Sequence, residues 1–189
     1  MDTIRHIVLK DELHSFIYRC MRAIGTSDSH SKSLADCLVL ADYRGHFSHG
    51  LNRLSIYVND IQAGVCEKDG RPSILKESPA TALIDGNNLL GPVVGTFAME
   101  LAIKKAKEVG IALVSVKGSN HFGIAGFYSL MATAQQLIGM SFTNGSPILA
   151  TSNGKRPFFA SNPLCVAAPG KEEDFVLDMA TSVVAYGKV

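Results

Sequence analysis

The spacing of apolar residues changes sharply along this 189-residue chain, and that change constrains its fold more than any other feature. In the first third, apolar side chains recur every three or four positions, as on one face of a helix. The first such segment ends at Gly25 and contains Leu13, Phe16, Ile17, Cys20, Met21 and Ile24. A second predicted helix is capped by Ser29 or Ser31 and ends near Gly45, and a third runs from about Leu54 to Gly64. We therefore expect a helical region at residues 1–66.

After Pro72 the pattern becomes an alternation of short strands and helices. The spacing predicts helices at residues 94–106 and 127–134, and strands at residues 74–75, 81–84, 111–116, 138–142, 164–168 and 175–177. The pair Asp85-Gly86 predicts a turn after the second strand, and residues 178–189 resemble the start of an apolar helix. Such alternation predicts a sheet with helices packed on it.

The expected architecture is therefore α/β, with a helical region followed by a mixed sheet covered by helices. Residues 67–72 are polar and form the predicted linker between the two parts. We accordingly expect an amino-terminal region at residues 1–66 and an α/β region, with the cofactor and substrate sites, at residues 67–189.

Charge and cysteine content limit the possible partners. The chain has 18 basic and 17 acidic residues, so it lacks the charge excess that nucleic acids or anionic membranes select. No apolar run approaches the roughly 18 residues of a membrane helix, and no signal-peptide pattern opens the sequence. Its four cysteines are scattered without a C-x-x-C pair, which favours reduced thiols. We expect a small-molecule partner and a cytoplasmic location.

One candidate site lies in Ser48-His49-Gly50, with Arg53 following. A histidine can exchange protons near neutral pH, and a guanidinium binds a carboxylate through two parallel hydrogen bonds. If a helix starts at this point, His49 and Arg53 share a face near its amino end and could hold and protonate a small organic acid. The alternative is a structural segment in which Ser48 caps the helix and Arg53 is a solvated charge.

A second candidate site follows the predicted strand at residues 111–116. His121 lies beyond the carboxyl end of this strand, where α/β sheets commonly bind ligands. Ser119 and Asn120 are polar neighbours that could orient its ring. The alternative is a histidine that only hydrogen-bonds within its turn.

Other chemistries receive less support. The sequence has no G-x-G-x-x-G, P-loop, H-E-x-x-H or G-x-S-x-G motif. His46 and His49 could pair on a metal, but no nearby ligand completes a set of usual spacing, so we expect no metal site. An acyl-transfer pair of Ser48 with a histidine is also unfavourable, because adjacent side chains do not normally face each other. Asp178 lies in an apolar run and needs a ribose hydroxyl, a backbone amide or an arginine as partner if it is buried.

Taken in order, six motifs resemble the malate/L-lactate dehydrogenase family, which lies outside the Rossmann class. They are the segment from Ala41 to Arg53, Asp85-Gly86, Ser119-Asn120-His121-Phe122-Gly123, Thr143-Asn144, Ser161-Asn162-Pro163-Leu164 and Val176-Leu177-Asp178-Met179-Ala180-Thr181-Ser182. The resemblance implies a sulfolactate-dehydrogenase-like fold, a homodimer, and NAD- or NADP-dependent hydride transfer between a 2-hydroxy acid of the malate or lactate type and its 2-keto acid.

The resemblance also implies roles for particular residues. His49 or His121 would transfer the proton, and the choice between them stays open. Arg53, with Ser48 beside it, would bind the substrate. The cofactor would be bound by Asn144 and by Val176, Leu177, Asp178, Met179, Ala180 and Thr181.

Length is the main departure from the family, whose members commonly continue for well over a hundred further residues, including a glycine-rich segment beside the nucleotide. The α/β region is therefore expected to be incomplete at its carboxyl end. Either a dehydrogenase or a truncated, non-catalytic relative that binds or dimerises is compatible with the sequence.

Overall fold

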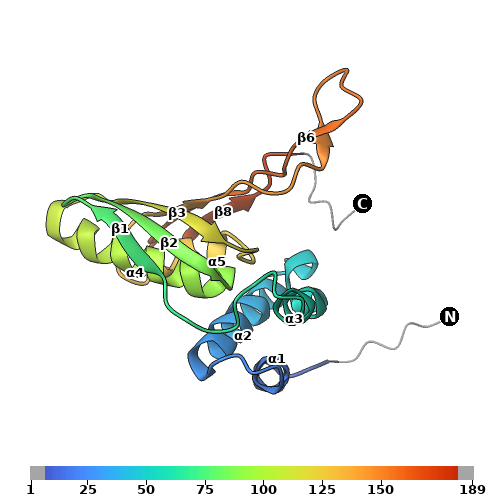
Figure 1. Cartoon of the computed structure of the whole chain (residues 1–189). Helices are drawn as coiled ribbons and strands as arrows, with labels where there is room; N and C mark the ends of the chain where they lie inside the picture. Colours follow the sequence, from blue (N-terminus) through green and yellow to red (C-terminus); the bar gives the residue numbers. More distant parts are fainter. Residues whose placement is uncertain (1–6, 183–189) are drawn as a thin grey trace.

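Helices form the first part of the protein, in a computed structural model that describes residues 7–182. The three helices are α1 (Lys10–Ala23), α2 (Asp28–Tyr43) and α3 (Leu54–Gln62). Two short 3₁₀ turns, η1 (Phe47–His49) and η2 (Leu51–Arg53), connect α2 to α3. Figure 1 shows this group in blue and cyan beneath the strands. The three predicted helices are thus confirmed.

The start of α2 differs from the prediction. Ser27, rather than Ser29 or Ser31, is the N-cap, and the helix begins at Asp28. The backbone N–H of Ser31 donates to the carbonyl of Ser27 at 3.0 Å, so the first helical hydrogen bond already starts there. The two predicted caps therefore lie inside the first turns of the helix.

A strand–helix–strand unit follows the helices. It comprises β1 (Ser73–Glu77), β2 (Thr81–Leu89), α4 (Gly91–Val109) and β3 (Leu113–Ser119). β1 pairs with β2 in antiparallel orientation, and β2 pairs with β3 in parallel orientation. α4 supplies the long crossover that a parallel pair requires, and it packs on both strands.

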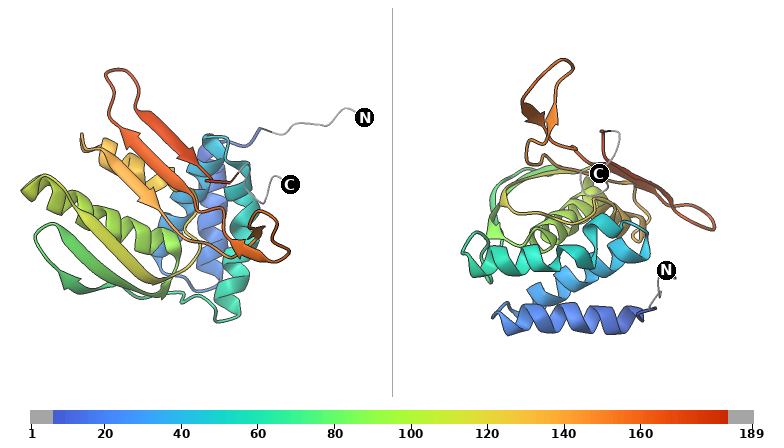
Figure 2. Two further views of the ribbon diagram at one scale, coloured as in Figure 1. Left: turned by 90° about the horizontal axis from the view of Figure 1, so that it is seen from above. Right: turned by 90° about the vertical axis from the view of Figure 1, so that its right-hand side faces the viewer.

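A second sheet contains the remaining long strands. Its elements, together with the helix that covers it and a small projecting hairpin, are α5 (Gly126–Thr133), β4 (Gly139–Phe142), β5 (Leu149–Ala150), β6 (Pro157–Phe159), β7 (Leu164–Ala168) and β8 (Phe175–Met179). β7 lies between β4 and β8 and is antiparallel to both, so β4 and β8 run in the same direction. α5 packs against all three strands. The β5–β6 hairpin projects away from both sheets (Figure 2).

The expected α/β class with packed helices is confirmed, although hydrogen bonding divides the strands among three sheets. The predicted turn at Asp85-Gly86 is wrong, because β2 continues to Leu89. Asn87 and Asn88 have positive φ angles of 51° and 56°, and the register with β3 shifts across them. Asparagine tolerates this left-handed conformation, so the pair forms a bulge within the strand.

The predicted helix at residues 178–189 is also wrong for the part that the structure describes. Asp178 and Met179 are the last residues of β8 and pair with Cys165 and Leu164 of β7. Residues 180–182 are not helical either, and residues 183–189 lie outside the described part. The short apolar run gave no means to distinguish the end of a strand from the start of a helix.

One apolar core joins the two parts of the chain. Ile17, Leu38 and Tyr57 from the helical region pack in the same buried cluster as Leu90, which precedes α4. The predicted linker at residues 67–72 is fixed to the end of β2, since the N–H of Glu67 donates to the carbonyl of Asn88 at 2.9 Å. The domain boundary at residue 66 stays a prediction. Within residues 7–182, no helix has both the length and the apolar character to cross a membrane.

Gly95 provides a test of how α4 packs on α5. A Cβ at this position would lie 2.6 Å from Cζ of Tyr128, whose side chain is buried and stacks on Phe122. We expect Gly95→Ala to lower the free energy of unfolding by about 1–3 kcal/mol, because overpacking exceeds the gain in helix propensity. Urea unfolding measures this change. Lys104→Ala, at an exposed position of the same helix, should stay within about 0.5 kcal/mol, and a stable Gly95→Ala variant would contradict the packing.

Candidate active site

The two candidate histidines meet on one side of α2. The rings of His49, in η1, and His121, in the loop between β3 and α5, stack with their centroids 5.5 Å apart and their planes 23° apart. These residues are 72 positions apart in the sequence, so their contact depends on the tertiary fold.

Two glycines and two side chains of α2 determine where these loops lie. A Cβ at Gly50 would clash with the carboxylate of Asp42, which accepts the N–H of Leu51 at 2.8 Å. A Cβ at Gly123 would clash with Sγ of Cys37, and Gly123 has a φ of +75°. Each histidine therefore lies near a glycine because its loop approaches α2 too closely for any other residue.

Arg53 lies beside the histidine pair. Its Nε donates to the carbonyl of Ser48 at 2.6 Å, which fixes the guanidinium relative to η1. Arg53 forms no ion pair among residues 7–182. Its charge is also one of the causes that lower the pKa of His121. The guanidinium is thus positioned to bind a carboxylate next to the rings. His49 and Arg53 lie on consecutive 3₁₀ turns, and not on one face of an α-helix as predicted.

Ser48 does face its neighbour, contrary to the expectation for adjacent side chains. Its Oγ lies 2.8 Å from Nδ1 of His49, and the residue is buried with an exposure of 8%. The tight 3₁₀ turn brings the hydroxyl and the ring together. Ser48 therefore orients the imidazole of His49.

Tyr57 of α3 is a site residue that sequence reasoning missed. Its Oη lies 2.6 Å from Nδ1 of His121, and the two rings make an edge contact with centroids 5.6 Å apart. Burial raises the pKa of Tyr57 well above its ordinary value, so its hydroxyl keeps its proton. The apolar spacing of α3 placed Tyr57 in the core, where its ring does lie. Its position four residues after Arg53 is the signal that could have identified it.

The predicted orienting role of Ser119 and Asn120 is wrong. The side-chain amide of Asn120 donates to Oδ1 of Asn88 at 3.0 Å, and Ser119 is a weak donor to the carbonyl of Asn120 at 3.5 Å. These side chains tie the end of β3 to the bulge of β2. The ring of His121 is oriented by other groups.

The N–H of Gly123 donates to Nδ1 of His121 at 3.3 Å, and the hydroxyl of Tyr57 contacts the same nitrogen. Because Nδ1 accepts this N–H, the proton of the neutral ring lies on Nε2. Desolvation lowers the pKa of His121, and the charge of Arg53 lowers it further, while Asp60 opposes the change. The rings of His49 and Tyr57 pack against the imidazole, although the residue as a whole is exposed. The neutral imidazole is therefore the main form at pH 7.

The residues predicted to contact a cofactor gather only in part. Asn144 and Thr181 each lie two positions beyond the carboxyl ends of β4 and β8, which run in the same direction. The backbone and side chain of Thr181 both donate to the carbonyl of Ser161, at 2.9 and 3.0 Å. Because β4 and β8 run in the same direction on either side of β7, Asn144 and Thr181 follow the same end of this sheet.

Asp178, near this end of the sheet, connects β8 to the helix that follows the histidine loop. Its Oδ2 accepts the N–H of Gly126, the first residue of α5, at 2.7 Å, and α5 begins only five residues after His121. The backbone amide was one of the three partners predicted for this carboxylate. Exposure alternates along β8, so Val176 and Asp178 are on the α5 side while Leu177 and Met179 are on the other face. Ala180 follows the strand. The stretch from residue 176 to residue 181 therefore cannot line one site with all its side chains.

Metal ligands do not cluster here. No group of three or more histidine, cysteine or acidic side chains within the described part of the chain could hold a metal ion.

The chain is similar to known proteins in both sequence and structure. The sequence profile of the malate/L-lactate dehydrogenase family matches residues 8–189. The chain belongs to this family. The malate dehydrogenase of Pyrococcus abyssi is 47% identical over 180 residues, which cover 95% of this chain and 50% of that protein. The chain thus spans about half the length of this relative.

Solved structures of malate/L-lactate dehydrogenase family members confirm the predicted fold. Malate dehydrogenase from Pyrococcus horikoshii OT3 has a TM-score of 0.94 at 48% identity, over 96% of this chain and 52% of that one. Sulfolactate dehydrogenase from Methanocaldococcus jannaschii has a TM-score of 0.92 at 42% identity, over 97% and 53% of the two chains. The expected sulfolactate-dehydrogenase-like α/β fold is therefore correct.

The lowered pKa of His121 gives a titration test in this family member. Its folded pKa should lie below 6.5, so the free energy of unfolding should decrease as pH falls below about 6.5, where the unfolded chain binds the proton and the native chain does not. Arg53→Gln should raise the pKa of His121 by removing a neighbouring positive charge. NMR titration of the imidazole measures both values. Arg156→Gln, in the distant hairpin, should leave the pKa unchanged, and a His121 pKa above 6.5 would contradict the site.

Proposed function

We propose that this chain is an NAD- or NADP-dependent oxidoreductase that interconverts a 2-hydroxy acid and its 2-keto acid. The observation that carries the proposal is the meeting of two imidazoles with one guanidinium beside α2. Relatives named malate dehydrogenase and L-sulfolactate dehydrogenase support a hydroxy acid as the substrate class. Both names describe acids with a carboxylate next to the reacting carbon.

Arg53 holds the substrate carboxylate in this proposal. Its Nε is bonded to Ser48, so the terminal nitrogens of the guanidinium are the groups that bind the acid. A fixed guanidinium also fixes the orientation of the adjacent carbonyl carbon, which lowers the entropic cost of reaching the reactive geometry. Ser48 contributes indirectly, by holding Arg53 through its carbonyl and His49 through its hydroxyl.

His121 transfers the proton. In reduction, the protonated ring gives the Nε2 proton to the oxygen of the keto group and returns to the neutral form. In oxidation, the neutral ring accepts the hydroxyl proton at Nε2. The hydroxyl of Tyr57 can donate to Nδ1 or accept from it, so it accompanies either protonation state. His49 stacks on His121 and limits its orientations. It is the alternative proton donor, and the activities of the His49→Gln and His121→Gln variants distinguish the two candidates.

A nicotinamide cofactor supplies a hydride when it is bound. The described residues fit the nicotinamide and ribose end of such a molecule, because the uncharged polar residues Asn144 and Thr181 follow the same end of this sheet. Asp178 of β8 also accepts the N–H of Gly126, five residues after His121. The amino end of α5 does not fit the pyrophosphate, since the carboxylate of Asp178 already occupies the N–H of Gly126 and would repel an anion. The proposal covers NAD and NADP alike.

The natural setting that we propose is a cytoplasmic homodimer with a small-molecule substrate. Neither nucleic acid nor a membrane is expected as a partner, in keeping with the nearly balanced charge of the chain.

A non-catalytic binding or dimerising module is the second candidate. It is favoured by one surface, the face of β4 and β8 away from α5, where Met140, Phe142, Phe175, Leu177 and Met179 are 42–61% exposed. Apolar patches of this kind mark interaction surfaces. The two candidates differ in whether the isolated chain turns over substrate.

The central test is oxidation of NADH or NADPH by the purified chain with a panel of 2-keto acids. We expect turnover that His121→Gln lowers by about 10²–10⁴-fold, because a general acid is lost. Arg53→Gln should instead raise KM for the acid by about 10-fold or more. Arg19→Gln, at an exposed position of the outer helix α1, should have no effect. If His49→Gln abolishes turnover and His121→Gln does not, the assignment of the proton donor is wrong; if the folded chain binds no nucleotide, the second candidate is supported.

The position of Tyr57 predicts a distinct effect on the pH profile. The value of kcat/KM for reduction should fall as pH rises through the lowered pKa of His121, because reduction needs the protonated ring. Tyr57→Phe should lower kcat by about 10-fold and shift this pH profile, with little change in KM. Val58→Ala, on the same helix, is the matched control. A loss in Tyr57→Phe without a shifted profile would assign Tyr57 to packing alone.

A further inference from the structure

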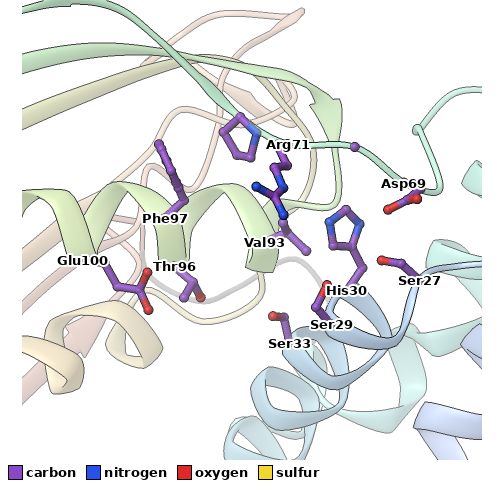
Figure 3. Close-up of a pocket in the computed structure, with 12 residues that line it drawn as sticks. Ser27, Ser29, His30, Ser33, Asp69, Arg71, Val93, Thr96, Phe97 and Glu100 are labelled. Atoms are coloured by element: carbon purple, nitrogen blue, oxygen red, sulfur yellow. The ribbon is translucent and has the colours of Figure 1, made fainter.

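A second pocket lies away from the histidine pair, between the amino end of α2, the first turns of α4 and residues 69–72 (Figure 3). Its volume is about 600 Å³, and it shares no lining residue with the candidate active site. It lies at the amino end of α2, whereas η1 follows the carboxyl end of the same helix. The pocket is therefore a separate site.

A buried histidine with one unpaired ring nitrogen lines this pocket. His30 is 5% exposed, and its Nδ1 has no hydrogen-bond partner among the described residues. The hydroxyl of Thr96, on the α4 side, is also buried without a partner. Leaving a buried polar atom unsatisfied costs free energy, and a polar ligand in this pocket would provide partners for both atoms. Figure 3 shows the ring of His30 between the side chains of Arg71 and Asp69.

Hydrogen-bond donors and one positive charge line the side of the pocket next to His30, whereas Glu100 lies beyond Thr96, away from His30 (Figure 3). Ser27 makes no side-chain capping bond to α2, and the amides of residues 28–30 precede the first residue bonded within this 16-residue helix. These amides carry partial positive charge. The guanidinium of Arg71 lines the pocket and forms no ion pair within residues 7–182. An oxyanion is the natural partner of such a set.

Asp69 determines which oxyanion fits. The N–H of Gly70 lowers the pKa of its carboxyl group, with the charges of His30 and Arg71 adding to the effect, so Asp69 stays ionised. A ligand therefore meets donors on one side and a carboxylate acceptor on the other. A phosphate group that keeps a P–O–H satisfies both, whereas sulfate and carboxylate ions only accept. The apolar side chains of Val93 and Phe97 complete the wall and suit an organic substituent.

We propose that this pocket binds the monoanionic form of the phosphate group of a small phosphorylated metabolite, through Arg71, His30 and the amino end of α2, with Asp69 accepting the phosphate proton. The proposal does not depend on the dehydrogenase activity. Binding should raise the free energy of unfolding, because a ligand that binds only the native chain stabilises it by mass action.

Titration of the chain with inorganic phosphate, followed by the imidazole NMR signals of His30, tests the proposal. At pH 7 phosphate keeps at least one proton and sulfate keeps none, so phosphate should give a saturable shift and sulfate at equal ionic strength should bind at least about 10-fold more weakly. Arg71→Gln should weaken phosphate binding by about 10-fold or more, because a charge-assisted bond is lost. Arg71 is exposed, so this variant should fold.

Two further variants make the outcome decisive. Asp69→Asn should remove the preference for phosphate over sulfate, and Arg19→Gln, on the outer helix α1, should leave binding unchanged. The proposal is overturned if phosphate gives no saturable shift, if sulfate binds equally well to the wild-type chain, or if Arg19→Gln weakens binding as much as Arg71→Gln does. The organic part is tested at about pH 5.5, where the phosphate group of glucose 6-phosphate also keeps one proton. If glucose 6-phosphate then binds more tightly than inorganic phosphate, the apolar wall takes the organic part; equal affinities would overturn that part of the proposal.

Discussion

The close approach of two loops to α2 is the constraint on which the candidate active site depends. Asp42 leaves no room for a Cβ at Gly50, and Cys37 leaves none at Gly123. One helix therefore positions both histidines, and the buried hydroxyl of Tyr57 then holds the ring of His121. Any change that moves α2 would move both loops together, so the geometry of the site is tied to the packing of the amino-terminal helices.

The helix also relates the two sites of the molecule. Its carboxyl end leads into η1 and the histidine pair, and its amino end opens into the pocket that contains His30. The first site has a guanidinium beside imidazoles and suits a carboxylate, while the second combines a guanidinium with an ionised carboxyl group and suits a protonated phosphate. The two sites share a guanidinium and an imidazole but select different ligands, because only the second also contains a carboxylate that can accept a proton.

Local sequence signals predicted much of this arrangement. Glycine near each histidine marked the loops, and helical spacing gave α1, α3 and the crossover α4, because these patterns depend on neighbours in the chain. The bulge at Asn87 and Asn88 was missed since asparagine favours turns and bulges alike. The helical spacing predicted only a core position for Tyr57, because its side chain is buried and its contact with His121 depends on the tertiary fold. The strand pairing of Asp178 depends on β7, which no local pattern reveals.

The most direct test is a crystal structure of the chain with oxamate, an unreactive analogue of a 2-keto acid, in the presence of nicotinamide nucleotide. The account predicts that the carboxylate of oxamate binds the guanidinium of Arg53 and that its carbonyl oxygen lies within hydrogen-bond distance of Nε2 of His121. Oxamate bound away from Arg53, or with its carbonyl directed away from both imidazoles, would contradict the proposed chemistry.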